Sequence, residues 1–490
     1  MVGITQVNLI STFVLLLILW TDNFEAGNVT KTIRTRRLKS LTNVTNEEAL
    51  FLTPFITSQK LNDAKNLARV QDLFVFSKSE GEDVPNNITE SYSGFLTVNS
   101  TFNSNLFFWF VPAVEDKENA PVLLWLNGGP GTTSLVAFFN EHGPYYLDET
   151  MKLRSRDVSW VSTHSIIYMD SPVGAGFSFT ENEDGYPRFI EDVVRDLYSG
   201  LTQFFLIFPE YQSQEFYVAG QSYAGKYAPA LAHRIHEGNQ DSPKVKINLK
   251  GISVGSGFFD PASQLNFADF YYQIGLIDES QKTYFEEQEA LTLDLINTGN
   301  WSQAFVVLES LIVGYPTPSG ISHFERVTGL KYNLNILMEK EPVGNRYFIP
   351  FLRQDAIRSA LHVGTQKFYK FNPKVYNLMH EDIYQSIKPK FIDLLNWDYK
   401  ILVYASQFDA IIPYTTVNNF INSLKWKLSD EYSKAVRETW RVGSNNSVAG
   451  YKKTVANLNF LVIRNSGHLV AQDQPEWTFE MLNKFTRNEL

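Results

Sequence analysis

Ser222 lies in a run of residues that suits a catalytic nucleophile. The apolar, strand-like stretch 216–218 leads into GQSYAG, and apolar residues then recur at helical spacing as far as Ile235. A strand that enters a helix through G-x-S-x-small is typical of a nucleophile elbow, whose sharp turn lifts the serine hydroxyl off the sheet. Gly220 and Ala224 are small, as so tight a turn requires. We therefore predict a nucleophilic Ser222 at a helix N-terminus, where the helix dipole favours developing negative charge.

Two later strand ends carry an acid and a base. The strand-like runs 400–404 and 459–463 are followed by Asp409 and His468. His468 is predicted to take the proton of Ser222, and Asp409 to hold the imidazole tautomer and stabilise the imidazolium. Serine, acid and histidine occur in this chain order in α/β hydrolases, where each follows a strand of the sheet.

Strand-like and helix-like segments alternate through the first half of the chain. Aromatic and β-branched residues at 93–98 and 105–110 flank a polar turn and predict a β-hairpin. The run 121–126 is continuously apolar, as expected of a strand buried on both faces. This alternation indicates an α/β fold with a mainly parallel central sheet covered by helices. Further strands are predicted at 165–169 and 247–254, and helices at 189–208, 278–296, 301–313 and 477–485.

The pattern changes between about residues 258 and 393, where segments look helical and no buried strand is evident. We predict a mostly helical cap insertion at 258–393, over the carboxyl ends of the strands. It would divide the α/β core into a first part at 51–257 and a second part at 394–490.

Five ordered motifs carry a resemblance to a known family. The chain resembles the serine carboxypeptidases, and the vitellogenic-type members in particular, from about residue 51 to about residue 485. The resemblance implies the α/β-hydrolase fold. The motifs are WLNGGPG (125–131), EHGPY (141–145), DSPVGAGFS (170–178), QSYAGKY (221–227), and SGH (466–468) with DQP (473–475).

The resemblance also implies an activity and further site residues. Members release single C-terminal amino acids from peptides through an acyl-enzyme. The implied oxyanion hole consists of the backbone N–H groups of Gly129 and Tyr223, which agrees with the usual arrangement of one donor after the nucleophile and one from a glycine loop. The residues implied to surround the terminal carboxylate of the substrate are Asn127, the backbone of Gly128, Glu141 and Gln221.

Gln221 departs from the family pattern, in which glutamate usually precedes the nucleophile. A glutamate pair with Glu141 must hold a proton to bind a carboxylate, whereas glutamine donates N–H at every pH. We therefore expect substrate affinity to decline less above pH 6 than in relatives. The alternative is an impaired enzyme.

Composition excludes several classes of function. The net charge of −10 and the pI of about 5.4 argue against a nucleic-acid partner. The absence of cysteine excludes thiol catalysis and cysteine metal sites. No cofactor and no metal are predicted, and the predicted partners are peptide or protein C-termini as substrates. An acyltransferase or esterase on the same scaffold, and a catalytically silent binding protein, remain as alternatives.

The N-terminal stretch predicts entry into the secretory pathway. An apolar run at 13–20 is too short to span a bilayer but suits the core of a signal peptide, which we place at 1–26, with an uncleaved anchor as the alternative. An N-terminal arm at 27–50, open to processing, would follow, and no later membrane span is predicted. The predicted glycosylation sites are the sequons at Asn28, Asn43, Asn87, Asn99, Asn300 and Asn445.

The final four residues, RNEL at 487–490, resemble the K-D-E-L class of endoplasmic-reticulum retrieval signals. Members of the family are often lysosomal or secreted. The predicted location is therefore outside the cell or in the lysosome, with retention in the endoplasmic reticulum as the alternative.

Overall fold

The computed structural model describes residues 48–70 and 90–490, which belong to one compact unit spanning residues 46–490. The predicted signal peptide, most of the predicted arm and the sequons Asn28, Asn43 and Asn87 lie outside the described residues.

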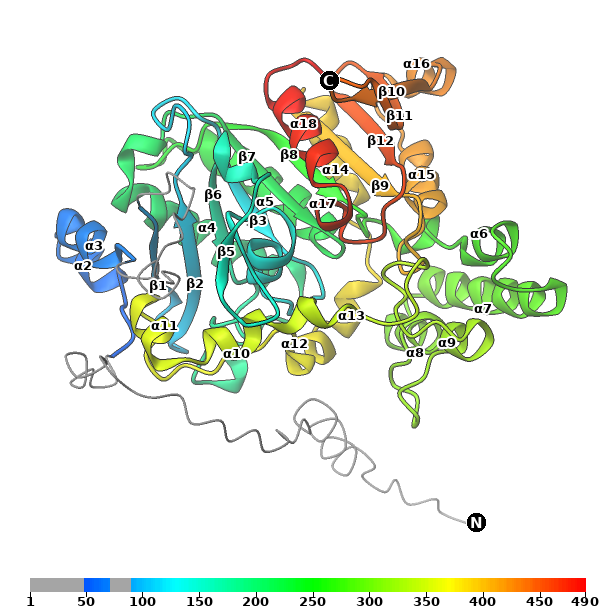
Figure 1. Cartoon of the computed structure of the whole chain (residues 1–490), viewed down its shortest axis with the longest axis horizontal. Helices are drawn as coiled ribbons and strands as arrows, with labels where there is room; N and C mark the ends of the chain where they lie inside the picture. Colours follow the sequence, from blue (N-terminus) through cyan, green and yellow to red (C-terminus); the bar gives the residue numbers. More distant parts are fainter. Residues whose placement is uncertain (1–47, 71–89) are drawn as a thin grey trace, which may run out of the picture. The chain divides into compact units, whose positions relative to one another are not determined.

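A ten-stranded sheet runs through this unit (Figure 1). Its six central strands pair in parallel, and antiparallel strands close both edges. Because parallel strands end at the same edge, the loops that follow them gather there. In spatial order the strands are β1 (Tyr92–Asn99), β2 (Ser104–Val111), β6 (Ser165–Met169), β3 (Val122–Leu126), β7 (Phe216–Gln221), β8 (Leu249–Gly255), β9 (Lys400–Ser406), β12 (Leu458–Ile463), β11 (Ser447–Val455) and β10 (Glu438–Val442).

The central strands are buried on both faces, which explains why their sequences are continuously apolar. Successive residues point to opposite faces, so that in β3 Leu124 joins one apolar cluster while Leu123 and Trp125 join the other. The first cluster includes α4 (Ile190–Ile207) and α5 (Ala224–Gln240), and the second includes α17 (Val470–Asp473) and α18 (Pro475–Thr486). The predicted α/β architecture, a mainly parallel sheet covered by helices, is confirmed.

Helices make up every named element between β8 and β9. The longest are α7 (Glu279–Asn297) and α8 (Trp301–Ile312), which pack against each other. The others are α6 (Phe267–Gln273), α9 (His323–Thr328), α10 (Phe348–Leu352), α11 (Asp355–Ala360), α12 (Pro373–Leu378), α13 (His380–Ile383) and α14 (Lys388–Asn396), with two short 3₁₀ turns. We call this region, residues 256–399, the helical insert.

The helical insert contacts loops at the carboxyl edge of the sheet. The backbone N–H of His468, which follows β12, donates to the carbonyl oxygen of Leu334 at 2.6 Å. The N–H of Asn372 donates to the carbonyl oxygen of Gly131, which follows β3, at 3.0 Å. These bonds place the insert beside the residues predicted to do chemistry.

The strands β10 and β11 were not predicted from the sequence. In β10 only two of five residues are buried, so its sequence lacks the continuous apolar run of a central strand. The remaining strands are β4 (Tyr145–Leu147), paired with β5 (Leu153–Ser155), and the remaining α-helices are α2 (Thr53–Thr57), α3 (Leu61–Ala68), α15 (Tyr414–Ser423) and α16 (Ser429–Lys434). A short π-helix, Ala137–Glu141, and three 3₁₀ turns complete the described chain.

Candidate active site

Ser222 occupies the turn between β7 and α5. Its φ is +63°, a left-handed value that is uncommon outside glycine and recurs at functional sites. A Cβ atom added to Gly220 would lie 2.6 Å from the Cβ of Ala224 and 2.3 Å from the carbonyl oxygen of Leu126. The turn is therefore too tight for any other residue at position 220, and it has the geometry of a nucleophile elbow.

Asp409 and His468 are in direct contact, although 59 residues separate them. The Nδ1 atom of His468 lies 2.6 Å from Oδ2 of Asp409, and both side chains are buried. The other oxygen, Oδ1, accepts the backbone N–H groups of Ile411 at 2.9 Å and Ile412 at 3.0 Å. With its Nδ1 proton donated to Asp409, the histidine is left with Nε2 as an acceptor.

Ser222 is less tightly joined to this pair. Among the described residues no hydrogen bond links the hydroxyl of Ser222 to the imidazole of His468. Hydrogen bonds of catalytic groups are often long in the absence of substrate and tighten when it binds. The three side chains nevertheless follow β7, β9 and β12, which are parallel strands of one sheet.

The glycine loop after β3 packs against the elbow. A Cβ atom on Gly128 would lie 2.5 Å from the backbone nitrogen of Tyr223 and 2.7 Å from the Cβ of Ser222. Gly129 has φ of +109°, which favours glycine. The backbone of this loop thus reaches the residue that follows the nucleophile, as an oxyanion hole requires.

Glu141 and Gln221 form a buried pair beside the elbow. Gln221 Nε2 donates to Glu141 Oε1 at 2.7 Å, whereas Oε2 of the same carboxyl is buried without a hydrogen-bond partner among the described residues. Burial raises the pKa of Glu141 to about 7, against the opposing effects of the Gln221 hydrogen bond and the nearby His468. The carboxyl is thus neutral over most of the acidic range, with one oxygen open to another partner.

Trp125 orients Asn127, a role that the sequence analysis missed. The indole Nε1–H donates to Oδ1 of Asn127 at 2.7 Å. With its oxygen occupied in this way, the amide of Asn127 keeps its NH₂ group as a donor. The spacing of an aromatic donor two residues before the asparagine, on the same face of a strand, could have indicated this contact.

Asp473 supports the loop that carries His468. Its Oδ2 accepts the backbone N–H of Gly467 at 2.7 Å and the side-chain amide of Asn335 at 3.0 Å. The DQP motif that contains Asp473 therefore holds the histidine loop against the helical insert.

A nucleophile elbow on a parallel sheet, with an acid–histidine pair after two later strands, defines an α/β hydrolase. A model of the family described as "Serine carboxypeptidase" matches residues 82–488. The chain belongs to the serine carboxypeptidase family, as the motifs predicted, and is a serine-type hydrolase.

Curated relatives match over nearly the whole chain. The "Probable serine carboxypeptidase CPVL" of Homo sapiens is 44% identical over 89% of this chain and 89% of its own length. The "Venom serine carboxypeptidase" of Apis mellifera is 41% identical over 90% and 91%, respectively. The "Vitellogenic carboxypeptidase" of Aedes aegypti is 37% identical over 90% of each chain.

A solved structure supports the fold. The prohormone-processing carboxypeptidase Kex1Δp of Saccharomyces cerevisiae superimposes with a TM-score of 0.73 at 22% identity, covering 86% of this chain and 96% of that one. The α/β-hydrolase fold is thereby confirmed.

Proposed function

We propose that this protein releases single C-terminal amino acids from peptides through an acyl-enzyme on Ser222. Nε2 of His468 takes the hydroxyl proton as the serine oxygen attacks the last peptide carbonyl. The imidazolium, stabilised by Asp409, then protonates the departing amine, and water attacks the ester in the reverse sequence. The 2.6 Å contact between His468 and Asp409, two residues that follow parallel strands of the same sheet as the elbow serine, is the observation that carries this proposal.

The negative oxygen of the tetrahedral intermediate is assigned to the backbone N–H groups of Gly129 and Tyr223. The close approach of the glycine loop to the nitrogen of Tyr223 supports this assignment. Loss of one such donor typically costs about 3–4 kcal/mol of transition-state stabilisation.

The terminal carboxylate of the substrate is assigned to Asn127, the backbone of Gly128, Glu141 and Gln221. Three groups can donate to it without a positive charge: the NH₂ of Asn127, the second Nε2 hydrogen of Gln221 and the Glu141 oxygen that has no hydrogen-bond partner among the described residues. Only the neutral form of Glu141 donates, and its raised pKa keeps that form populated at acidic pH.

Peptide digestion tests whether the protein cleaves peptides and whether cleavage starts at the C-terminus. We expect a peptide with a free C-terminus to lose one residue at a time, and the same peptide with a C-terminal amide to resist, because the amide cannot use the carboxylate site. A fluorophosphonate should label Ser222. Cleavage of esters without release of amino acids would favour the alternative esterase, and absence of labelling would favour a silent binding protein.

Substrate affinity should respond to pH through Glu141. Because its pKa lies at about 7, the carboxyl is neutral below that pH and ionised above it, where it repels the substrate carboxylate. We expect a flat KM from pH 4.5 to 6.5 and a rise above pH 7 that approaches about tenfold per unit. Steady-state kinetics from pH 4.5 to 8.0 measure this directly.

Two variants at the carboxylate site give the controls. Gln221→Glu places a second carboxyl 2.7 Å from Glu141, so that the pair shares one proton and the KM rise begins at lower pH. Glu141→Gln removes the titrating group and should abolish the rise. Parallel KM profiles for the wild type and Gln221→Glu would contradict this role for position 221.

The protein is assigned to the secretory pathway, as a secreted or lysosomal glycoprotein. Of the three sequons that the structure describes, Asn300 and Asn445 are exposed and Asn99 is half-buried at the end of β1, so the first two are the more accessible acceptors. No helix within residues 48–70 and 90–490 is long and apolar enough to cross a membrane. Endoglycosidase treatment followed by gel electrophoresis tests whether these two asparagines are glycosylated. Asn300→Gln and Asn445→Gln should each lose part of the mobility shift that the enzyme produces in the wild type.

Retention in the endoplasmic reticulum is the less favoured location. Leu490 is half-buried against the second apolar cluster, and its carbonyl oxygen accepts from Nζ of Lys452 at 3.4 Å. A retrieval receptor would have to draw Leu490 out of these contacts. Immunolocalisation of a variant that lacks Leu490 distinguishes retention from a secreted or lysosomal location. If Leu490 mediates retention, the variant should leave the endoplasmic reticulum and be released from the cell.

A further inference from the structure

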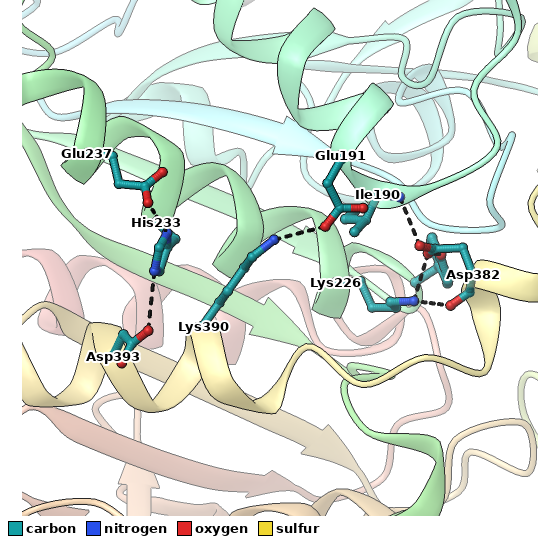
Figure 2. A network of polar contacts seen from close by, with 9 residues as sticks. Ile190, Glu191, Lys226, His233, Glu237, Asp382, Lys390 and Asp393 are labelled. Atoms are coloured by element: carbon teal, nitrogen blue, oxygen red, sulfur yellow. Dashed lines mark hydrogen bonds and ion pairs between the residues drawn. The ribbon is translucent and has the colours of Figure 1, made fainter. Parts of the chain in front are cut away.

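A buried ion pair lies one turn beyond the nucleophile. Nζ of Lys226, in the first turn of α5, donates to Oδ2 of Asp382 at 2.7 Å and also to its backbone carbonyl oxygen. Each side chain is only 1% exposed. Asp382 belongs to α13 of the helical insert, so the pair joins the insert to the elbow helix (Figure 2).

The same carboxylate binds the side chain of the residue that follows Ser222. The hydroxyl of Tyr223 donates to Oδ2 of Asp382 in a short hydrogen bond. Burial raises the pKa of Tyr223 well above its ordinary value, and the charge of Asp382 raises it further, so the hydroxyl stays protonated and donating. Oδ1 of Asp382 accepts the backbone N–H of Ile190, the first residue of α4, at 2.8 Å (Figure 2).

The gain in stability from the buried Lys226–Asp382 ion pair is too small to explain its presence. A buried ion pair is often no more stabilising than a well-packed apolar pair of the same volume, because both ions lose hydration. Burial indeed lowers the pKa of Lys226, with Asp382 acting in the opposite direction. What the pair adds is a fixed position for the Tyr223 ring, because one carboxylate oxygen receives both the tyrosine hydroxyl and the ammonium group.

We propose that Asp382 is a positioning residue for catalysis, which holds the peptide between Ser222 and Tyr223 so that the Tyr223 N–H points at the developing oxyanion. This inference rests on the proposed function, since it assigns an indirect role at the same oxyanion hole. Because the Asp382 carboxylate belongs to α13, full activity then requires the helical insert to be packed against the elbow helix.

The elbow also has backbone supports, and two of them act on the peptide between Ser222 and Tyr223 itself. The N–H of Ser222 donates to the carbonyl oxygen of Gly255 at 3.0 Å, and its carbonyl oxygen accepts the N–H groups of Gly225 at 2.9 Å and Phe258 at 3.0 Å. Because that carbonyl belongs to the peptide between Ser222 and Tyr223, the backbone keeps this peptide in place when the tyrosine hydroxyl is removed. The side-chain anchor then sets the final orientation of the Tyr223 N–H, and its loss costs only part of the oxyanion stabilisation.

Tyr223→Phe removes that anchor and leaves the backbone donor in place. We expect kcat to fall about tenfold, part of the roughly 10²–10³-fold loss that follows complete removal of an oxyanion donor. KM should stay within about twofold, because the carboxylate site is untouched, and labelling of Ser222 by a fluorophosphonate should slow in parallel with kcat. An unchanged kcat and labelling rate would overturn the proposal.

Tyr227→Phe is the matched control. Tyr227 lies one turn further along α5, its ring centroid is 5.1 Å from that of Tyr223, and its buried hydroxyl has no hydrogen-bond partner among the described residues. Loss of this hydroxyl should leave kcat and the labelling rate unchanged. An equal loss of kcat in both variants would assign the effect to general packing and overturn the proposal.

The double variant Lys226→Met/Asp382→Leu separates positioning from stability. It removes both charges together, so no unpaired ion remains buried, but the N–H of Ile190 and the hydroxyl of Tyr223 lose their acceptor. We therefore expect a modest fall in Tm, with the variant still folded at the assay temperature. Its kcat should fall as in Tyr223→Phe, and adding Tyr223→Phe to it should cost no further activity. A stable double variant with wild-type kcat would overturn the proposal.

The Ser222→Ala variant shows which inference has failed. If it keeps peptidase activity near the wild-type level, the proposed function fails. A Ser222→Ala variant with only trace activity, together with a fully active Tyr223→Phe, contradicts only the role of Asp382.

Discussion

Replacing Ser222 by alanine should lower kcat for peptide cleavage about 10⁶-fold, the loss expected when a triad nucleophile is removed. That corresponds to about 8 kcal/mol of barrier. KM should change little, because the carboxylate site proposed above consists of other residues: Asn127, Glu141 and Gln221. Residual activity should remain well above the reaction in water, since the oxyanion donors and the binding site are intact. Single-turnover measurements at high enzyme concentration provide the necessary range.

The decisive control is the combination with His468→Ala. Residues that act as one catalytic unit are strongly non-additive, so the Ser222→Ala/His468→Ala double variant should be about as slow as either single variant. Losses that multiply would mean that the two side chains act in separate steps, which contradicts a triad. Melting temperatures of all three variants exclude unfolding as the cause of the loss.

The proposed catalytic residues could be singled out from the sequence because their signals are local. A strand, a tight turn and a helix surround Ser222, and a buried strand precedes both Asp409 and His468. The sheet then brings these distant segments together, because β7, β8, β9 and β12 are neighbours and their parallel pairing aligns their carboxyl ends. This prediction did not require the order of the strands in the sheet. It required only that each of the three residues follows a strand.

The positioning of the elbow could not be predicted in the same way. Asp382 lies 156 residues from Lys226 in a helix of only four residues, and an isolated aspartate in such a segment has no pattern that marks it as buried. Its role depends on how the helical insert packs on α4 and α5, which no periodicity encodes. The orphaned oxygen of Glu141 is likewise visible only after Gln221 is placed beside it.

Asp409→Asn tests the orientation of the base and should lower kcat about 10⁴-fold. The amide oxygen can keep the hydrogen bonds from the N–H groups of Ile411 and Ile412, so the loop should retain its conformation. The amide nitrogen would then face Nδ1 of His468, 2.6 Å from the present oxygen. Because that nitrogen donates, the histidine must present Nδ1 as the acceptor and carry its proton on Nε2, where it cannot take the proton of Ser222. Steady-state kcat near neutral pH, together with an unchanged KM, is the measurement.

Asp473→Asn is the matched control, because it removes another carboxylate, a half-buried one, that contacts the loop carrying the same histidine. Within the part of the chain that the structure describes, Oδ2 of Asp473 accepts from Gly467 N and from Asn335, and the amide oxygen of asparagine can accept from both in its place. We expect its kcat to remain within about tenfold of the wild type, since no tautomer depends on it. A deficit as large as that of Asp409→Asn would mean that net negative charge around His468, rather than one directed hydrogen bond, sustains the base. The difference between the two asparagine variants therefore measures how much of catalysis depends on the tautomer that Asp409 selects.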